Sequence, residues 1–167
     1  ASKYGGGIYT GTATVSVTGG LISNNKAVKN YGGGIGVSQS ADVTLENCTI
    51  TGNSGAKGGG VYDYGKLTIN EGTIISDNTA NGDETGGGGI FVNKAATLTM
   101  NGGTITKNTA PNTYGGGIYL LGTSTVMTMT GGEITGNSAK SNGGGIYCNE
   151  ATVNLGGTSV IKNNKLS

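Results

Sequence analysis

The sequence predicts an all-β protein, a right-handed parallel β-helix of about six rungs with three short strands in each rung. Near copies of one motif recur every 26–29 residues, and each copy contains three short runs typical of strands, separated by glycine or asparagine. A repeat of this length is typical of a solenoid, in which each copy packs only against its neighbours. We therefore expect residues 1–167 to form one continuous domain. The copies begin at Gly5, Gly32, Gly58, Gly87, Gly115 and Gly143.

The first predicted strand of each copy follows a run of glycines and directs one aliphatic side chain into the core. These inward residues are Ile8, Ile35, Val61, Ile90, Ile118 and Ile146. Because side chains alternate between the two faces of a strand, the next residue should point outward. It is aromatic in every copy but the second, which has Gly36. We expect these rings to form an exposed exterior file that can contact sugars: Tyr9, Tyr62, Phe91, Tyr119 and Tyr147.

The second predicted strand alternates apolar and polar residues, as in Val43-Thr44-Leu45. This period of two is the signature of a strand with one buried face. The third strand is centred on a single apolar residue, and these residues are Ile22, Ile50, Ile75, Ile105, Ile134 and Val160. Apolar residues never recur with the helical period, and Gly, Thr and Asn disfavour helix, so we expect almost no helix. The known hand of parallel crossovers favours a right-handed coil.

An asparagine recurs three residues after the centre of each third strand. An asparagine at an equivalent turn in every rung can bond backbone groups and stack on the amide of the next rung. We therefore expect a structural ladder rather than a binding site. Its predicted members are Asn25, Asn53, Asn78, Asn108, Asn137 and Asn163.

The composition argues against several classes of function. The formal net charge of +1 does not favour binding to nucleic acid, and no apolar run approaches the roughly 18–20 residues that would cross a membrane. The chain contains neither His nor Arg, and its carboxylates are scattered. We therefore expect no catalytic residues, no metal site and no cofactor.

The two cysteines belong to the second and sixth copies. At about 4.8 Å per rung, Cys48 and Cys148 should lie too far apart for a disulfide bond. We expect two separate thiols, with Cys48 in the place of a turn glycine and Cys148 in the place of a core side chain.

The pairing of the motif GGGI[YF] with I-x-x-N resembles the GGAI and FxxN repeats of polymorphic outer-membrane proteins and related bacterial surface proteins. The resemblance covers all six copies. It implies an extracellular or cell-surface location in a bacterium. Ile stands here where that family has the Phe of FxxN, and no segment resembles its membrane barrel.

These features together predict a non-enzymatic surface or secreted domain that acts as a rigid spacer and adhesin, with glycans or host surface proteins as partners. One alternative is a β-helix protein that binds or degrades polysaccharides. Others are a subunit that assembles end to end into filaments, because no polar cap is visible, and an ice-binding protein, because Thr recurs outward as in Thr49-Ile50-Thr51. The missing caps and the lack of a signal peptide also lead us to expect a segment of a longer protein.

Overall fold

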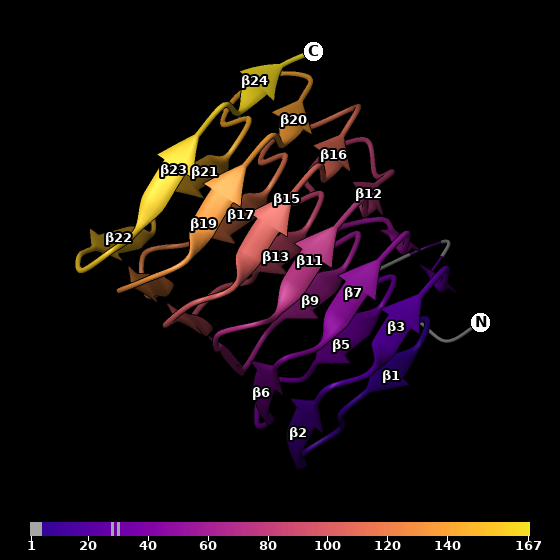
Figure 1. Ribbon diagram of the computed structural model, residues 1–167. Helices are drawn as coiled ribbons and strands as arrows, with labels where there is room; N and C mark the ends of the chain where they lie inside the picture. Colours follow the sequence, from indigo (N-terminus) through magenta and orange to yellow (C-terminus); the bar gives the residue numbers. More distant parts are fainter. Residues whose placement is uncertain (1–4, 28, 30) are drawn as a thin grey trace.

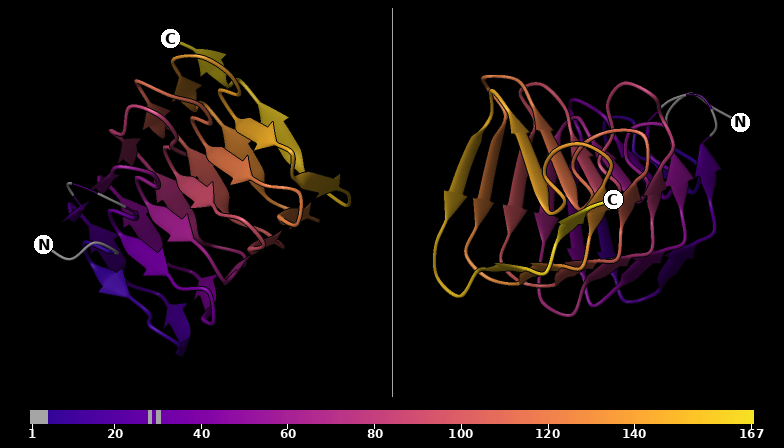
Figure 2. Two further views of the ribbon diagram at one scale, coloured as in Figure 1. Left: turned by 180° about the vertical axis from the view of Figure 1, so that it is seen from behind. Right: turned by 90° about the horizontal axis from the view of Figure 1, so that it is seen from above.

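The computed structural model describes residues 5–27, 29 and 31–167. Within these residues the chain winds into six rungs that stack into one parallel β-solenoid without any helix. The first four residues of the predicted domain lie outside the described residues. Figure 2 shows that successive rungs superpose along the coil, so that the first and last rungs lie at opposite ends. This confirms the predicted parallel β-helix.

Each rung contributes one strand to each of four parallel sheets, not to three. The first sheet contains β1 (Ile8–Tyr9), β5 (Ile35–Val37), β9 (Val61–Asp63), β13 (Ile90–Val92), β17 (Ile118–Leu121) and β21 (Ile146–Asn149). The second contains β2 (Thr14–Thr18), β6 (Asp42–Glu46), β10 (Lys66–Ile69), β14 (Thr97–Met100), β18 (Val126–Met129) and β22 (Thr152–Leu155).

The third sheet contains β3 (Leu21–Ser23), β7 (Thr49–Thr51), β11 (Ile74–Ser76), β15 (Thr104–Thr106), β19 (Glu133–Thr135) and β23 (Val160–Lys162). The fourth, which the sequence analysis missed, consists of two-residue strands that follow the ladder asparagines. These are β4 (Lys26–Ala27), β8 (Ser54–Gly55), β12 (Thr79–Ala80), β16 (Thr109–Ala110), β20 (Ser138–Ala139) and β24 (Lys165–Leu166).

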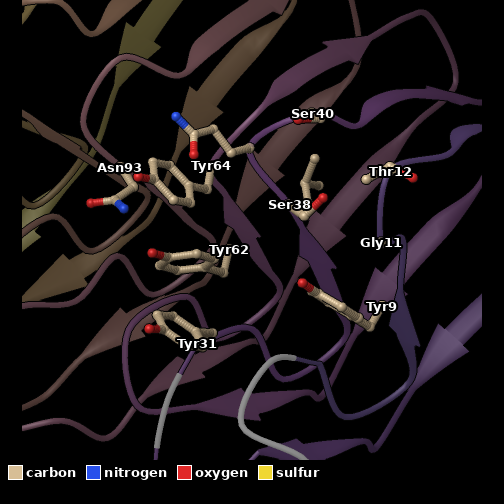
Figure 3. Close-up of a pocket in the computed structure, with 11 residues that line it drawn as sticks. Tyr9, Gly11, Thr12, Tyr31, Ser38, Ser40, Tyr62, Tyr64 and Asn93 are labelled. Atoms are coloured by element: carbon tan, nitrogen blue, oxygen red, sulfur yellow. The ribbon is translucent and has the colours of Figure 1, made fainter.

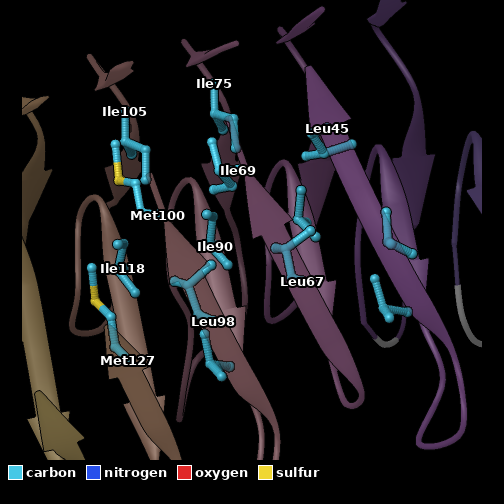
Figure 4. Packing of buried hydrophobic residues seen from close by; sticks show 14 of the residues in the cluster. Leu45, Leu67, Ile69, Ile75, Ile90, Leu98, Met100, Ile105, Ile118 and Met127 are labelled. Atoms are coloured by element: carbon cyan, nitrogen blue, oxygen red, sulfur yellow. The ribbon is translucent and has the colours of Figure 1, made fainter. Parts of the chain in front are cut away.

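The core is a set of apolar columns inside the coil. In the second sheet Val43, Leu67 and Leu98 lie in register, and all are buried. Figure 4 shows how the side chains of the inner rungs, such as Ile69 and Ile75, fill the space between the sheets. The predicted inward residues of the first two strands occupy these columns in every rung.

The third strand of the last rung differs by one residue from the prediction. Ile161, and not Val160, pairs with Ile134 in the inward column, whereas Val160 pairs with the partly exposed Glu133. The two residues are both β-branched, and the sequence alone did not distinguish their faces.

The asparagine ladder is present, and in the last rung its member also differs by one residue from the prediction. Each member but the last donates both its backbone N–H and its side-chain amide to Oδ1 of the asparagine in the next rung; from Asn78 to Asn108 both distances are 3.0 Å. The side-chain amide also donates to a carbonyl of the preceding rung, as from Asn108 to Ile75 at 2.9 Å. Asn164, not the predicted Asn163, accepts from Asn137 at the end of the ladder. Asn163 instead adopts a left-handed backbone, with φ of 54°.

The glycine runs form the corner between the fourth and first sheets. A Cβ on Gly88 would collide with the carbonyl oxygen of Gly116 and lie 2.6 Å from the backbone nitrogen of Thr109. Only a residue without a side chain allows backbones to approach this closely. The close contacts at this corner therefore fix the first sheet, which carries the aromatic residues, relative to the fourth sheet.

Candidate functional site

The aromatic side chains after each inward residue point out of the coil, but most of them are not exposed. Tyr62, Phe91 and Tyr119 are only 5%, 0% and 2% accessible, whereas Tyr9 is 47% accessible and Tyr147 is partly buried. The expected open file of rings is therefore wrong for the middle rungs. Other side chains pack against the rings there, and these are Tyr31, Tyr64, Tyr114 and Leu121.

The covered rings form a second hydrophobic cluster outside the main core. Phe91 stacks between Tyr62 and Tyr119, with centroid distances of 5.5 and 5.0 Å and nearly parallel planes. Spacings in this range are favourable for aromatic pairs. The ammonium group of Lys57 lies 5.6 Å from the Phe91 centroid and 5.8 Å from that of Tyr31, within the range of a cation–π contact.

The file is interrupted at Gly36, which lies between Tyr9 and Tyr62 in the register of the first sheet. A pocket of about 580 Å³ adjoins this position. Figure 3 shows the rings of Tyr9 and Tyr62 on two sides of it, with Tyr31 beside Tyr62. The two rings Tyr31 and Tyr62 are 4.4 Å apart at their centroids and tilted by 54°. The pocket therefore has aromatic walls in more than one orientation.

The remaining lining is polar and carries no formal charge. It contains Tyr64 and Val37 together with small polar and amide residues: Gly11, Thr12, Ser38, Gln39, Ser40 and Asn93. Within the described part of the chain, the Ser38 hydroxyl oxygen is buried and has no hydrogen-bond partner. Burial raises the pKa of Tyr62, and its neighbours Tyr31, Tyr64 and Asp63 raise it further, so its phenol stays neutral. The pocket thus offers ring faces and neutral donors and acceptors.

Asp63 lies directly behind this wall, on the core side of β9. It occupies an inward position, in register with Val37 and Val92, and is fully buried. Its Oδ1 accepts a hydrogen bond from the backbone N–H of Gly65 at 2.9 Å, and Oδ2 has no partner among the described residues. Burial raises the pKa of this carboxyl to about 7. Asp63 does not face the pocket, but both of its neighbours in the chain, Tyr62 and Tyr64, line it.

Neither thiol lines this pocket. Cys48 takes the turn position held by Gly20 and Gly103 in other rungs, but its side chain is buried in the core, which raises its pKa. Cys148 is in register with Leu120 at an inward position, as expected, yet it is exposed because it belongs to the last rung. Its thiol donates to the carbonyl of Ala151 at 3.0 Å. Among the described residues, no three His, Cys, Asp or Glu side chains are grouped as a metal site would require.

The sequence analysis noted the gap at Gly36 but missed the pocket. Tyr31 directly precedes the glycine run of its copy, as Tyr4 and Tyr114 do in two other copies, whereas Tyr64 has no aromatic counterpart in the other copies. The signal that could have found the pocket was the coincidence of these two extra aromatic residues with the one gap in the file.

Comparison with known families agrees with this architecture. Residues 2–131 match the family model described as the right handed beta helix region, and residues 131–149 match the Chlamydia polymorphic membrane protein repeat. The second match supports the resemblance to repeats of bacterial surface proteins. No curated protein and no solved structure gives a significant match. None of the described residues forms a helix long and apolar enough to span a membrane. Because the first match covers most of the sequence, the chain belongs to the right-handed β-helix family.

Proposed function

We propose that this chain is a non-enzymatic repeat domain of a bacterial cell-surface or secreted protein, which acts as a rigid spacer and binds glycans through the tyrosine-lined pocket. The observation that carries the proposal is the pocket itself, with tyrosine rings on its walls and neutral polar groups around them. Sugars present apolar C–H faces and a rim of hydroxyls, and aromatic rings and neutral hydrogen-bonding groups complement these two features.

The spacer role rests on the continuity of the fold. All four sheets run through all six rungs, and the asparagine ladder links every rung to the next. A solenoid of this kind has no hinge between separate cores, so it holds a surface site at a fixed distance from its ends. The similarity of residues 131–149 to a polymorphic membrane protein repeat supports the surface location.

The test is the binding of the purified chain to a panel of host and plant glycans, beside two variants of loop tyrosines. Tyr64→Ala removes a wall of the pocket, whereas Tyr114→Ala removes a similar covering ring that stacks on Tyr147, outside the pocket. We expect binding by the wild type and by Tyr114→Ala, and a loss of about fivefold for Tyr64→Ala, because each stacked ring contributes on the order of 1 kcal/mol. Wild-type protein that binds no glycan, or equal binding by all three proteins, would contradict the proposal.

A further inference from the structure

The turn between the first and second strands is shorter in the third rung than in the rungs on either side. In the second rung this turn spans residues 38–41, between β5 and β6, and in the fourth rung it spans residues 93–96, between β13 and β14. In the third rung only residues 64–65 join β9 to β10. The third rung therefore closes the same corner of the coil with a shorter segment of chain.

The two longer turns close through a hydrogen bond between backbone groups. The N–H of Ala41 donates to the carbonyl of Ser38, and the N–H of Ala96 donates to the carbonyl of Asn93, both at 3.0 Å. Bonds of this kind are typical of β-turns. Each long turn thus supplies its own backbone acceptor.

The short turn uses a side chain as its acceptor instead. Gly65 is the counterpart of Ala41, because its carbonyl accepts from the N–H of Thr97 at 2.9 Å as that of Ala41 accepts from Lys66 at 3.0 Å. The N–H of Gly65 donates to Oδ1 of Asp63 at 2.9 Å. An aspartate that bonds the backbone two residues further on can take the place of a backbone turn. The Asp63 carboxyl thus does what the carbonyl does in the longer turns.

Tyr64 is the residue that this hydrogen bond spans. Its N–H donates to the carbonyl of Val37 at 3.0 Å, and its ring packs against the aromatic cluster that contains Tyr62. Figure 3 shows the rings of Tyr64 and Tyr62 together at the pocket. Residues of both longer turns, such as Gln39 and Asn93, also line the pocket. The shortened turn therefore places Tyr64 between two longer turns.

The core offers no reason for a carboxyl group at this position. Asp63 is fully buried, and its in-register neighbours on β5 and β13 are both valine. The titratable groups beside it on its own segment are the phenols of Tyr62 and Tyr64, and the nearest basic residue in the sequence, Lys66, is exposed on β10. A valine would suit this column better, because a buried carboxyl is costly. The contribution of Asp63 is thus to the turn.

On the basis of the proposed function, we propose that Asp63 is a positioning residue of the pocket, whose carboxyl closes the shortened turn and so holds the Tyr64 ring where a glycan stacks on it. Asp63 itself does not touch the ligand. A neutral carboxyl remains in the column of valines, whereas an ionised one is drawn toward water and moves the turn with it. Burial raises the pKa of Asp63 to about 7. The pocket accordingly binds more tightly below neutral pH than above it.

The experiment compares glycan binding by the wild type, Asp63→Val and Asp63→Asn at about pH 5.5 and about pH 8.5. Valine matches the neighbours in the column and removes the acceptor, whereas asparagine keeps an Oδ1 acceptor and cannot ionise. We expect Asp63→Val to bind about fivefold more weakly than the wild type at the lower pH, and Asp63→Asn to restore binding. At the higher pH the wild type should weaken by a similar factor and Asp63→Asn should not. The control Asp83→Asn, at an exposed position, should keep the wild-type pH profile.

Nuclear magnetic resonance provides a measurement that does not depend on a ligand, and it keeps the test decisive if Asp63→Val does not fold. The Gly65 amide signal should titrate near neutral pH in the wild type and not in Asp63→Asn, and Asp63→Val should shift the Tyr64 ring signals. Wild-type binding by Asp63→Val, or a pH profile that Asp63→Asn leaves unchanged, would overturn the positioning role while the proposed function stands. If the wild type binds no glycan at either pH, the proposed function fails, and the signals of Gly65 and Tyr64 still decide whether Asp63 holds the turn.

Discussion

At the scale of single residues, Asp63 places a carboxyl group in apolar surroundings. It lies fully buried in a column whose neighbouring members are Val37 and Val92, and one of its carboxyl oxygens has no partner among the described residues. A charged carboxylate in such a place is costly, and the raised pKa of about 7 means that the folded protein keeps the carboxyl neutral at acidic pH. The hydrogen bond from Gly65 opposes the shift but does not cancel it.

The stability of the protein should therefore fall as the pH rises from about 4 to about 7. In this range the unfolded chain has already lost the Asp63 proton, whereas the folded chain retains it, so the folded state binds more protons and higher pH favours unfolding. The full effect is up to roughly 4 kcal/mol. Denaturant unfolding at a series of pH values measures it. Asp63→Asn should remove most of this slope, and Asp83→Asn, in an exposed loop, should not.

The stability of Asp63→Asn at high and at low pH tests whether the burial of Asp63 causes the pH dependence. If Asp63 resists ionisation because of burial alone, Asp63→Asn is more stable than the wild type at pH 8 and closer to it at pH 4. A wild-type slope that survives in Asp63→Asn would show that other groups determine the pH dependence.

The ladder shows how far single positions could be predicted. The recurrence of I-x-x-N identified the asparagines of the first five rungs, because the inward isoleucine fixes the count. In the last rung Val160-Ile161 and Asn163-Asn164 each offer two equivalent residues. The choice depends on which β-branched residue pairs with Ile134, and this is a property of the neighbouring rung rather than of the local sequence.

At the scale of strands, the sequence predicted the strands whose side chains alternate between apolar and polar, but it did not predict the strands whose side chains are small. The second strand was predicted residue by residue because its period of two is explicit. The fourth sheet was missed because its strands have two residues each, and their inward side chains are only Ala80, Ala110 and Ala139 in the inner rungs. Small residues are needed there because the fourth strands pack against the glycine corner, as the contact of Gly88 with Thr109 shows. The covered aromatic file was mispredicted for a different reason, since the rings that cover it, such as Tyr31 and Tyr114, occur in only some of the copies.

The glycine corner itself gives a prediction at this scale. Gly88→Ala would place a Cβ against backbone atoms of Gly116 and Thr109, which cannot move without breaking ladder hydrogen bonds. Gly156→Ala is a matched control, because a Cβ there meets nothing within 4 Å. We expect Gly88→Ala to lower the free energy of unfolding by about 3 kcal/mol and Gly156→Ala to change it by less than about 1 kcal/mol. Equal losses in chemical denaturation would show that the corner is not under steric constraint.

At the scale of the whole molecule, the stack has a direction. Each ladder asparagine donates to the one in the following rung, so Asn25 in the first rung offers its Oδ1 as an acceptor and Asn164 in the last rung offers amide donors. The last rung also exposes Leu155, Ile161 and Leu166, at 55%, 42% and 57%, whereas their counterparts in the preceding rung are fully buried. The two ends are thus complementary in hydrogen bonding, and among the described residues the strands of the first and last rungs have a neighbouring strand on one side only. In a longer polypeptide the same surfaces would pair with further rungs.

A polypeptide of these 167 residues should therefore associate head to tail, because the last rung of one copy can pair with the first rung of the next. Such a contact joins two different surfaces, so it does not close on itself and produces a distribution of sizes that grows with concentration. Light scattering over a range of protein concentrations measures this. The variant Leu155→Lys/Ile161→Lys places two charges on the last rung at accessible positions, where they oppose stacking without entering an inner rung, and it should remain monomeric. A wild type that is strictly monomeric at all concentrations would show that the complementarity of the ends is too weak to hold two copies together. A variant that associates as readily as the wild type would place the contact elsewhere on the solenoid.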